Sequence, residues 1–396
     1  MIKRTLSQKL HQLVKQYPVI TITGPRQSGK TTFVRSELKD FRYFSLENPD
    51  TRQIALDDPR GFLNSFKTSV ILDEIQRAPD LFSYIQTKVD EDDRPGRFIL
   101  TGSQNFLLSE KIAQSLAGRT AILHLLPFSK RELLGQQPIS IENFPIVSEM
   151  ESISTELWQL LYQGFYPRIH DKQLNPTEWY AWYYQTYIER DVRLLQNIGD
   201  INAFTRFVRL CAGRNGQLVN FSNLAADAGI THTTARRWLS ILQAGFIVAL
   251  VQPHFENFRK RIVKSAKLYF FDTGLLAFLL GIRSAEELQF HAMRGSVFES
   301  FVFSELYKMF IHFGRLPSIY FWRDSTGHEI DFVIEQGKHL IAIEAKSGET
   351  FNTDFVKGLQ YFSALAGERV KQSILIYSGE ENFNFKNMNI LSWQAL

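Results

Sequence analysis

The chain has 396 residues, of which 44% are apolar and 22% charged, a formal net charge of +4 and one cysteine. It is too long for one ordinary core and has the composition of a soluble globular protein, so we expect several domains and no disulfide framework. The N-terminus lacks the apolar run of a secretion signal and no stretch is long enough to span a bilayer, so we expect a cytoplasmic protein without a membrane segment.

Residues 1–130 alternate short apolar runs with helical patterns. The runs VITIT, FRYFSL, SVILD, RFILTG and AILHLL predict strands at 19–23, 41–46, 69–73, 97–102 and 121–126. Strands that alternate with helices are typical of an α/β domain with a mostly parallel sheet.

A phosphate-loop pattern, GPRQSGKT, follows the first of these strands and precedes a helical run. Glycine lets backbone amides approach phosphates, and a helix N-terminus adds partial positive charge. Lys30 is expected to reach the β- and γ-phosphates, and the Thr31 hydroxyl to hold Mg²⁺. We therefore expect ATP and Mg²⁺ as cofactors, with the phosphates surrounded by Gly24, Gln27, Ser28, Gly29, Lys30, Thr31 and Thr32.

Acidic and polar residues end two further predicted strands. Asp73 is expected to bind Mg²⁺ through water, and Glu74 to polarise the attacking water. The alternative for this pair is a plain acidic helix N-terminus. Ser103 and Gln104 follow RFILTG and either sense the γ-phosphate or form a simple turn.

These segments resemble the AAA+ ATPases, and GPRQSGKTT, ILDEIQRAPDLF, ILTGSQNFLL and SLAGRT resemble a family of AAA+ ATPases with a restriction-endonuclease-like C-terminal domain. The resemblance covers nearly the whole chain and implies a five-stranded sheet with the phosphate loop after its first strand. Arg77 and Arg119 lie at positions where that family carries arginines. Each either reaches a phosphate bound to a neighbouring subunit, as an arginine finger, or forms an ion pair on the surface. Gln163 replaces the first glycine of that family's Gly-Gly-aromatic-Pro element.

The aromatic run EWYAWYYQTYIERDV (178–192) predicts a helix with Trp179, Tyr183 and Tyr187 on one face. Such a stripe either packs between domains or stacks on unpaired bases. Arg190, Asp191 and Arg193 are expected to form a polar edge beside it.

Residues 218–250 have the spacing of a helix-turn-helix, followed by a predicted hairpin at 246–251 and 267–272. This resembles a winged helix, with Ser222 and Thr231 as helix caps. One interpretation places Thr233, Thr234, Arg236 and Arg237 at DNA and a basic hairpin loop on its phosphates. In the other, the same fold contacts protein. The loop's basic residues are His254, Arg259, Lys260, Arg261, Lys264 and Lys267.

The C-terminal strands HEIDFVIE and LIAIEAKSG place Asp331 on one strand and Glu344 and Lys346 on the next. This is the D…ExK arrangement of the PD-(D/E)xK phosphodiesterases, in which carboxylates hold Mg²⁺ and the lysine acts on its water. Glu299, on a predicted apolar helix face, is expected to join the metal site, and Gln360 to be an accessory polar residue. The alternative is a solvated charged hairpin.

The sequence therefore predicts an AAA+ phosphate-loop ATPase domain with a parallel sheet (1–140), a helical connector (141–200), a winged-helix domain (201–282) and a nuclease-like α/β domain (283–396). The first functional hypothesis is a Mg²⁺-dependent ATPase coupled to nucleic acid, DNA before RNA, and to phosphodiester cleavage. The second is a nucleotide-gated scaffold whose C-terminal domain only binds a partner. Self-assembly is expected only by analogy with AAA+ relatives.

Overall fold

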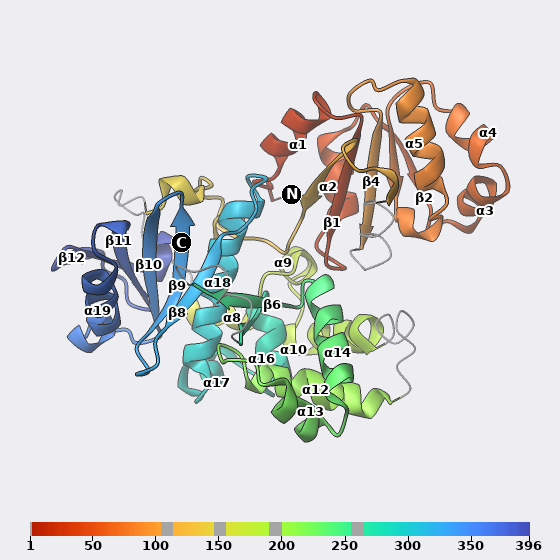
Figure 1. The fold of residues 1–396 in the computed structure, drawn as a ribbon. Coiled ribbons are helices and arrows are strands. Elements are labelled where there is room, and N and C mark those ends of the chain that lie inside the picture. The colour runs from red at the N-terminus through yellow and green to blue at the C-terminus, as the bar shows by residue number, and fades with distance from the viewer. Residues whose placement is uncertain (1, 104–113, 146–155, 190–199, 255–264) are drawn as a thin grey trace. The chain divides into compact units, whose positions relative to one another are not determined.

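The computed structural model describes residues 2–103, 114–145, 156–189, 200–254 and 265–396 (Figure 1). Two compact units can be distinguished. The first contains residues 1–138 together with 244–246 and 311–315, and the second contains the rest of the chain. The predicted division at residues 140, 200 and 282 stays a prediction.

The first unit is built on five parallel strands in the order β2-β3-β4-β1-β5. The strands are β1 (Val19–Gly24), β2 (Arg42–Ser45), β3 (Val70–Asp73), β4 (Phe98–Ser103) and β5 (Thr120–His124). All five lie within two residues of the predicted runs. The expectation of a five-stranded sheet with the phosphate loop after its first strand is confirmed.

Alternating strand residues divide the first unit into two cores. Val19, Leu72 and Leu100 pack on one face with helices α3 (Pro49–Asp57), α4 (Pro59–Asn64) and α5 (Leu81–Glu91). Their strand neighbours Ile20 and Ile71 pack on the other face with α1 (Ser7–Val14) and α2 (Lys30–Glu37). Because both faces are covered, β1, β3 and β4 are buried along their whole length, which explains their continuous apolar runs in the sequence. A short helix, α7 (Lys130–Leu133), follows β5.

The second unit begins with helices. They are α8 (Leu157–Gln163), α9 (Pro167–Lys172), α10 (Pro176–Tyr183) with a π-helical continuation (Tyr184–Glu189), α12 (Ile201–Gly213), α13 (Phe221–Ala228), α14 (His232–Ala244), α16 (Thr273–Leu279), α17 (Ala285–Phe290) and α18 (Arg294–Ile311). α13 is capped by Asn220, which accepts from the Asn223 amide at 3.1 Å, and not by Ser222 as predicted. Thr231 caps α14 as predicted, with its Oγ1 3.1 Å from the Thr234 amide.

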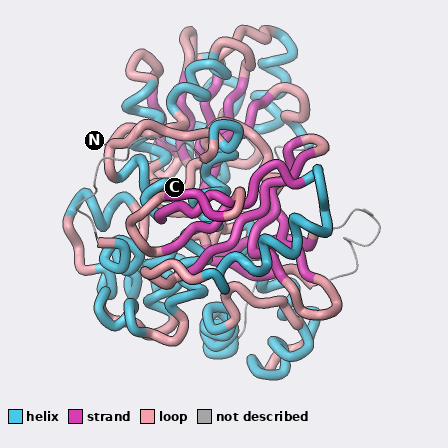
Figure 2. The backbone as a smooth tube through the Cα atoms, turned by 90° about the vertical axis from the view of Figure 1, so that its left-hand side faces the viewer, coloured by secondary structure: helices cyan, strands magenta, loops and turns pink. Residues whose placement is uncertain are grey.

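A mixed eight-stranded sheet completes this unit, in the order β12-β13-β11-β10-β9-β8-β6-β7 (Figure 2). Helix α19 (Lys357–Ala366) packs on it through Leu359 and Phe362. The strands are β6 (Val248–Pro253), β7 (Lys267–Phe270), β8 (Ile319–Arg323), β9 (Glu329–Gln336), β10 (His339–Lys346), β11 (Val370–Tyr377), β12 (Phe383–Phe385) and β13 (Met388–Ser392).

The hairpin β6–β7 differs from the expectation of a separate wing. β6 pairs with β7 antiparallel, as predicted, but Gln252 and Pro253 also pair in parallel with Tyr320 and Phe321 of β8. The hairpin is therefore an edge of the same sheet that carries Asp331 and Glu344. Within the described residues, no helix is long and apolar enough to cross a membrane.

Candidate functional site

The phosphate loop joins β1 to α2 and has an unusual backbone. Gln27 and Gly29 have φ of 64° and 91°, and α2 begins at Lys30. Gly24 ends β1, where an added Cβ would lie 2.2 Å from the Leu125 carbonyl oxygen. Only glycine permits this approach, so the first glycine of the pattern is required by packing of β1 against the chain after β5.

Lys30 is buried in this loop, with 6% of its surface exposed. Its Nζ donates to the carbonyl oxygens of Gly24 at 3.1 Å and Pro25 at 2.8 Å. Burial lowers the pKa of Lys30 to about 8, although Glu74 and Asp73 oppose this shift. The buried Ser28 Oγ has no hydrogen-bond partner within the described residues. A buried cation held only by carbonyls, next to an unsatisfied hydroxyl, fits a site for an anionic phosphate.

Asp73 lies at the end of β3 and collects hydroxyl groups from three other elements. Thr31 Oγ1 donates to its carboxylate, 2.9 Å from the nearer oxygen, and Tyr43 OH donates at 2.7 Å. Thr101 Oγ1 donates to the same carboxylate. Sequence reasoning predicted Thr31 beside Asp73 and missed Tyr43 and Thr101. Oxygen ligands from Asp73 and Thr31, next to Lys30, fit Mg²⁺ accompanied by a phosphate.

The other residues predicted for the nucleotide site are spread over three elements of the first unit. Glu74 follows Asp73 in a left-handed conformation, with φ of 59°, and accepts a hydrogen bond from Gln76 Nε2. Ser103 is buried at the end of β4, between β1 and β3. Thr32 is exposed on α2. Gln104 lies outside the described residues.

Both candidate arginine fingers form ion pairs within the first unit. Arg119 Nε lies 2.5 Å from Asp90 Oδ1, and Arg77 Nη2 lies 2.9 Å from Glu47 Oε1. Arg119 also directly precedes β5, which runs parallel to β1, so it lies at the amino end of the sheet. The phosphate loop is at the carboxyl end. The ion pair with Asp90 agrees with the second of the two interpretations of Arg119, and a role toward a neighbouring subunit's phosphate stays a prediction.

Arg4 supports the phosphate loop from behind and was not predicted. Its Nη1 donates to the Ser28 carbonyl at 3.2 Å and its Nη2 to the Leu126 carbonyl at 2.5 Å. Its Nε lies 3.3 Å from Glu132 Oε2, and both side chains are buried. Because a trans peptide points its N–H opposite to its C=O, Arg4 fixes the Gly29 amide on the far side of the loop.

The second predicted site forms where β9 and β10 pair. Ile343 of β10 pairs with Phe332 of β9, and the same antiparallel register brings their neighbours Glu344 and Asp331 opposite each other. Lys346 Nζ lies 2.6 Å from Glu344 Oε2 and 3.6 Å from Asp331 Oδ2. The predicted convergence of these three side chains is therefore present. Gln360 is exposed on α19, whereas Gly358 of that helix lies against Glu344.

A second lysine, which sequence reasoning assigned to the hairpin loop, also enters this cluster. Lys267 of β7 is buried, with Nζ 3.6 Å from Asp331 Oδ1 and in contact with Glu329 Oε1. Although burial opposes it, the carboxylates raise the pKa of Lys267. Two lysines also hold the pKa of Asp331 below its usual range, against the effect of its burial.

Glu299 does not complete a metal site in this arrangement. Its Oε2 accepts a hydrogen bond from Tyr269 OH at 3.1 Å. Burial, reinforced by Asp331, raises the pKa of Glu299 to about 8, and burial also raises that of Glu344. In the part of the chain that the structure describes, no three His, Cys, Asp or Glu side chains form a group suited to a metal ion. The predicted sharing of one metal by three carboxylates is therefore not supported for Glu299, which Tyr269 binds, and a metal held by Asp331 and Glu344 stays a prediction.

The helix-turn-helix is present as α13 and α14. Thr233, Arg236 and Arg237 are exposed on α14. Arg236 also lies over the Phe221 ring at 4.4 Å, and Thr234 contacts Thr231. His254 and Lys267 of the basic hairpin are buried. Arg259, Lys260, Arg261 and Lys264 lie outside the described residues.

The aromatic stripe is a packing feature. Trp179 stacks on Tyr183 at 5.0 Å, and Tyr183 contacts Tyr187 at 5.3 Å. All three are buried, so they offer no surface for bases. The predicted polar edge at Arg190, Asp191 and Arg193 falls outside the described residues.

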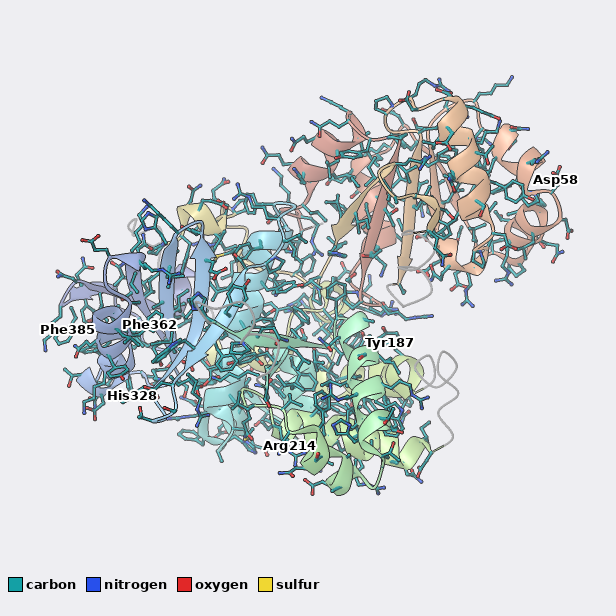
Figure 3. All side chains as sticks on the ribbon, viewed as in Figure 1. Asp58, Tyr187, Arg214, His328, Phe362 and Phe385 are labelled. Carbon is teal, nitrogen blue, oxygen red and sulfur yellow. The ribbon has the colours of Figure 1, made fainter. Side chains whose placement is uncertain are left out.

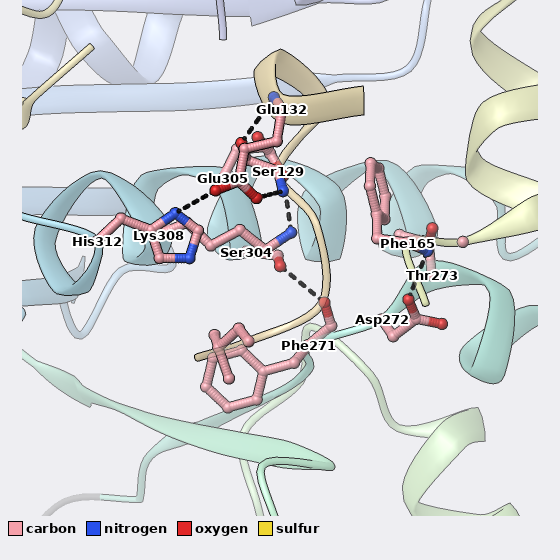
Figure 4. A network of polar contacts seen from close by, with 12 residues as sticks. Ser129, Glu132, Phe165, Phe271, Asp272, Thr273, Ser304, Glu305, Lys308 and His312 are labelled. Atoms are coloured by element: carbon pink, nitrogen blue, oxygen red, sulfur yellow. Dashed lines mark hydrogen bonds and ion pairs between the residues drawn. The ribbon is translucent and has the colours of Figure 1, made fainter. Parts of the chain in front are cut away.

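Asp272 binds the backbone next to Gln163, in the element that resembles the family's Gly-Gly-aromatic-Pro sequence. Its carboxylate accepts from the Phe165 amide at 2.8 Å (Figure 4). It also accepts from Tyr180 OH at 2.6 Å and from the Leu275 amide at 2.8 Å. It is 2% exposed, and Tyr180 OH also donates to the Gln163 carbonyl at 3.2 Å. These contacts are made to backbone groups of the element. A glutamine in place of glycine at position 163 therefore does not remove them.

Comparison with known families divides the chain into three matched parts. Residues 16–134 match the family described as an AAA domain, and residues 154–286 and 294–396 match two domains of unknown function, DUF8612 and DUF4143. The uncharacterized protein Rv2008c of Mycobacterium tuberculosis is 30% identical over 386 residues, covering 96% of this chain and 81% of its own. The uncharacterized protein MJ1544 of Methanocaldococcus jannaschii is 24% identical over 379 residues, covering 91% and 82%.

Solved structures give a weaker likeness. The Walker-type ATPase PABY2304 of Pyrococcus abyssi aligns with a TM-score of 0.42 and 16% identity, over 70% of this chain and 96% of that one. A RuvB variant of Thermotoga maritima aligns with a TM-score of 0.31 and 18% identity, over 62% and 88%.

Proposed function

Since this chain belongs to the same family as the mycobacterial protein Rv2008c and carries an AAA domain, we propose that it is an ATPase that binds ATP with Mg²⁺. One observation carries the proposal. Thr31 Oγ1 donates to Asp73, while the adjacent Lys30 is buried among loop carbonyls. These are a hydroxyl, a carboxylate and a cation in the positions that a Mg²⁺-bound triphosphate needs.

Each residue has a distinct task in this proposal. The loop amides and Lys30 bind phosphate oxygens, and Thr31 and Asp73 hold Mg²⁺, which neutralises charge on the phosphates when bound. Glu74 orients the attacking water and takes its proton, and the strained backbone at φ 59° keeps its side chain at the end of β3. Ser103, at the end of the strand between β1 and β3, contacts the terminal phosphate.

The test is steady-state ATP hydrolysis with matched variants. Lys30→Ala and Glu74→Gln should each reduce the rate by at least about a hundredfold, with Glu74→Gln still binding nucleotide. Arg60→Ala is the control, because Arg60 is exposed on α4. Hydrolysis that survives in Lys30→Ala would show that the site is wrongly assigned.

We further propose that nucleic acid, DNA before RNA, is the partner to which hydrolysis is coupled. The net charge of +4 and the exposed Arg237 on α14 support this part. Hydrolysis rates with duplex DNA, single-stranded DNA and RNA test it directly. A protein that ignores all three, but changes its oligomeric state with ATP, would instead be a nucleotide-gated scaffold in the cytoplasm.

A second candidate function, metal-dependent phosphodiester cleavage, rests on the Asp331–Glu344 pair and Lys346 at 2.6 Å. Two carboxylates are the number that Mg²⁺ often uses when substrate phosphates supply further ligands. Nicking of supercoiled DNA with Mg²⁺ or Mn²⁺ should then disappear in Asp331→Ala and Lys346→Ala. If the parent protein nicks neither DNA nor RNA with either metal, the C-terminal site only binds a partner.

A further inference from the structure

A groove on α12 concentrates positive charge in a place that no motif indicated. Its volume is about 710 Å³, and three of its eight lining residues are arginines, Arg206, Arg209 and Arg214. The other lining residues are neutral and include the amides Asn202 and Gln217. The groove lies on helix α12 and the turn that follows it (Arg214 is labelled in Figure 3).

The charge is not balanced within the helix. α12 has the sequence INAFTRFVRLCAG, which contains no acidic residue. Arg206 and Arg209 are three residues apart, so their side chains leave the same face of the helix. Like charges at this spacing destabilise a helix slightly. An anionic ligand would remove this cost.

Two of the arginines are held in place by α13. Arg206 Nε donates to the Ala228 carbonyl at 3.2 Å, and Arg214 Nη2 pairs with Asp227. Arg214 Nη1 is buried without a hydrogen-bond partner among the described residues. A buried N–H group without an acceptor is costly, so this donor points to an acceptor that the chain does not supply. Arg209 is exposed and has no partner in the described ranges.

The lining also indicates which chemistry would bind. Planar guanidinium groups suit phosphate oxygens, which they contact in a bidentate manner. No aromatic side chain lines the groove, so bases would find no stacking surface. The lining therefore favours the sugar–phosphate backbone of a duplex over unpaired bases.

We propose that the α12 groove binds the phosphate backbone of duplex nucleic acid independently of sequence. This inference rests on the nucleic-acid part of the proposed function and deepens it. The helix-turn-helix interpretation places the contact with nucleic acid on α14, where Arg236 lies over Phe221. Our proposal places the main contact with the phosphates on the arginines of α12 instead. Phosphate contacts of this kind position a protein on DNA without reading its sequence.

The experiment measures the affinity of the full chain for a fluorescent 30-base-pair DNA of arbitrary sequence between 50 and 300 mM salt. Arg209→Ala removes an exposed side chain without structural contacts, so the fold should persist. It should weaken binding at least about tenfold at 100 mM salt and lower the slope of log affinity against log salt by about 1. A second DNA sequence should show the same loss.

Two matched variants distinguish the alternatives. Arg168→Ala, which changes an exposed arginine on α9, should leave DNA binding unchanged. Arg237→Ala, on the helix-turn-helix surface of α14, should weaken binding less than Arg209→Ala does. If Arg237→Ala abolishes binding and Arg209→Ala does not, the α14 surface is the site and our inference is wrong. The same holds if inorganic tripolyphosphate binds through Arg209 while the duplex does not bind there. If the parent protein binds no nucleic acid at all, that part of the proposed function fails as well.

Discussion

Arg4 offers the sharpest test of how the phosphate loop is built. Arg4→Ala removes three contacts: to the Ser28 carbonyl at 3.2 Å, to the Leu126 carbonyl at 2.5 Å and to Glu132 at 3.3 Å. It leaves Glu132 charged, with only 2% of its side chain exposed. Breaking a buried ion pair in this way costs about 3–5 kcal/mol of stability. The Gly29 amide also loses its fixed direction, and one charge-assisted hydrogen bond to phosphate is worth about 1.5–3 kcal/mol, or about 10- to 150-fold in nucleotide affinity.

Arg4→Lys separates the two effects. A lysine keeps a positive charge beside Glu132 but cannot hold both carbonyls, because it lacks the planar fork of arginine. We therefore expect most of the stability to return and most of the affinity loss to remain. Unfolding is followed by circular dichroism, since all six tryptophans lie in the second unit and report only on that unit. They are Trp158, Trp179, Trp182, Trp238, Trp322 and Trp393.

The pH dependence provides a further check. The pKa of Glu132 is lowered, because Arg4, His312 and two backbone amides together overcome the effect of burial. The pair therefore stabilises the fold above the unfolded pKa of Glu132, and this contribution is lost as pH falls through the lower folded value. The stability difference between Arg4→Ala and the parent should shrink on acidification. A melting curve for Arg4→Ala that matches the parent at pH 7, or full nucleotide affinity in Arg4→Lys, would refute the reasoning.

Four more outcomes follow from the contacts described above. Gly24→Ala should abolish nucleotide binding or folding, measured by fluorescent ADP titration and thermal melting, because its Cβ would lie 2.2 Å from the Leu125 carbonyl. Burial lowers the pKa of Lys30 to about 8, so ADP affinity should be constant below that pH and fall about tenfold per unit above it; a flat profile to pH 9.5 contradicts this. Asp272→Ala leaves the buried amides of Phe165 and Leu275 unpaired and removes one of two acceptors of Tyr180 OH, so it should cost about 3 kcal/mol or more in urea unfolding followed by tryptophan fluorescence, with Asp272→Asn milder. Lys267→Met should destabilise the second unit by about 3 kcal/mol at pH 7, and the loss should shrink only as the pH falls toward the lowered pKa of Asp331 and its carboxylate is protonated.

Much of the first unit could be predicted because its signals are local. An apolar run buried on both faces, followed by glycine or aspartate, marks a parallel strand and its functional end, and Lys30, Thr31 and Asp73 were placed together on that basis. Tyr43 and Thr101 were missed because the sequence does not show that their strands, β2 and β4, lie on either side of β3. Without the sheet order, no strand hydroxyl can be assigned to Asp73. The partnership of Arg4 with Glu132 spans 128 positions and has no periodic pattern.

The placement of Arg119 was available from the sequence. An arginine directly before a parallel strand lies at the amino end of the sheet, whereas the phosphate loop follows the carboxyl end of β1. The edge pairing of β6 with β8 was not available, because an isolated hairpin and a sheet edge have the same alternation. Lys267 entered the acidic cluster through that pairing. Its basic character alone suggested a solvent-exposed loop.

The unit that contains the phosphate loop is assembled from three stretches of chain, 1–138, 244–246 and 311–315. Phe246 contributes a ring 5.3 Å from His124, and His312 Nδ1 lies 3.7 Å from Glu132 Oε1. A fragment cut after residue 138 would lack both, and the acid that anchors Arg4 would lose one of its neighbours. Truncation is therefore a poor way to isolate the nucleotide chemistry of this protein, and point variants in the intact chain are the sounder tool.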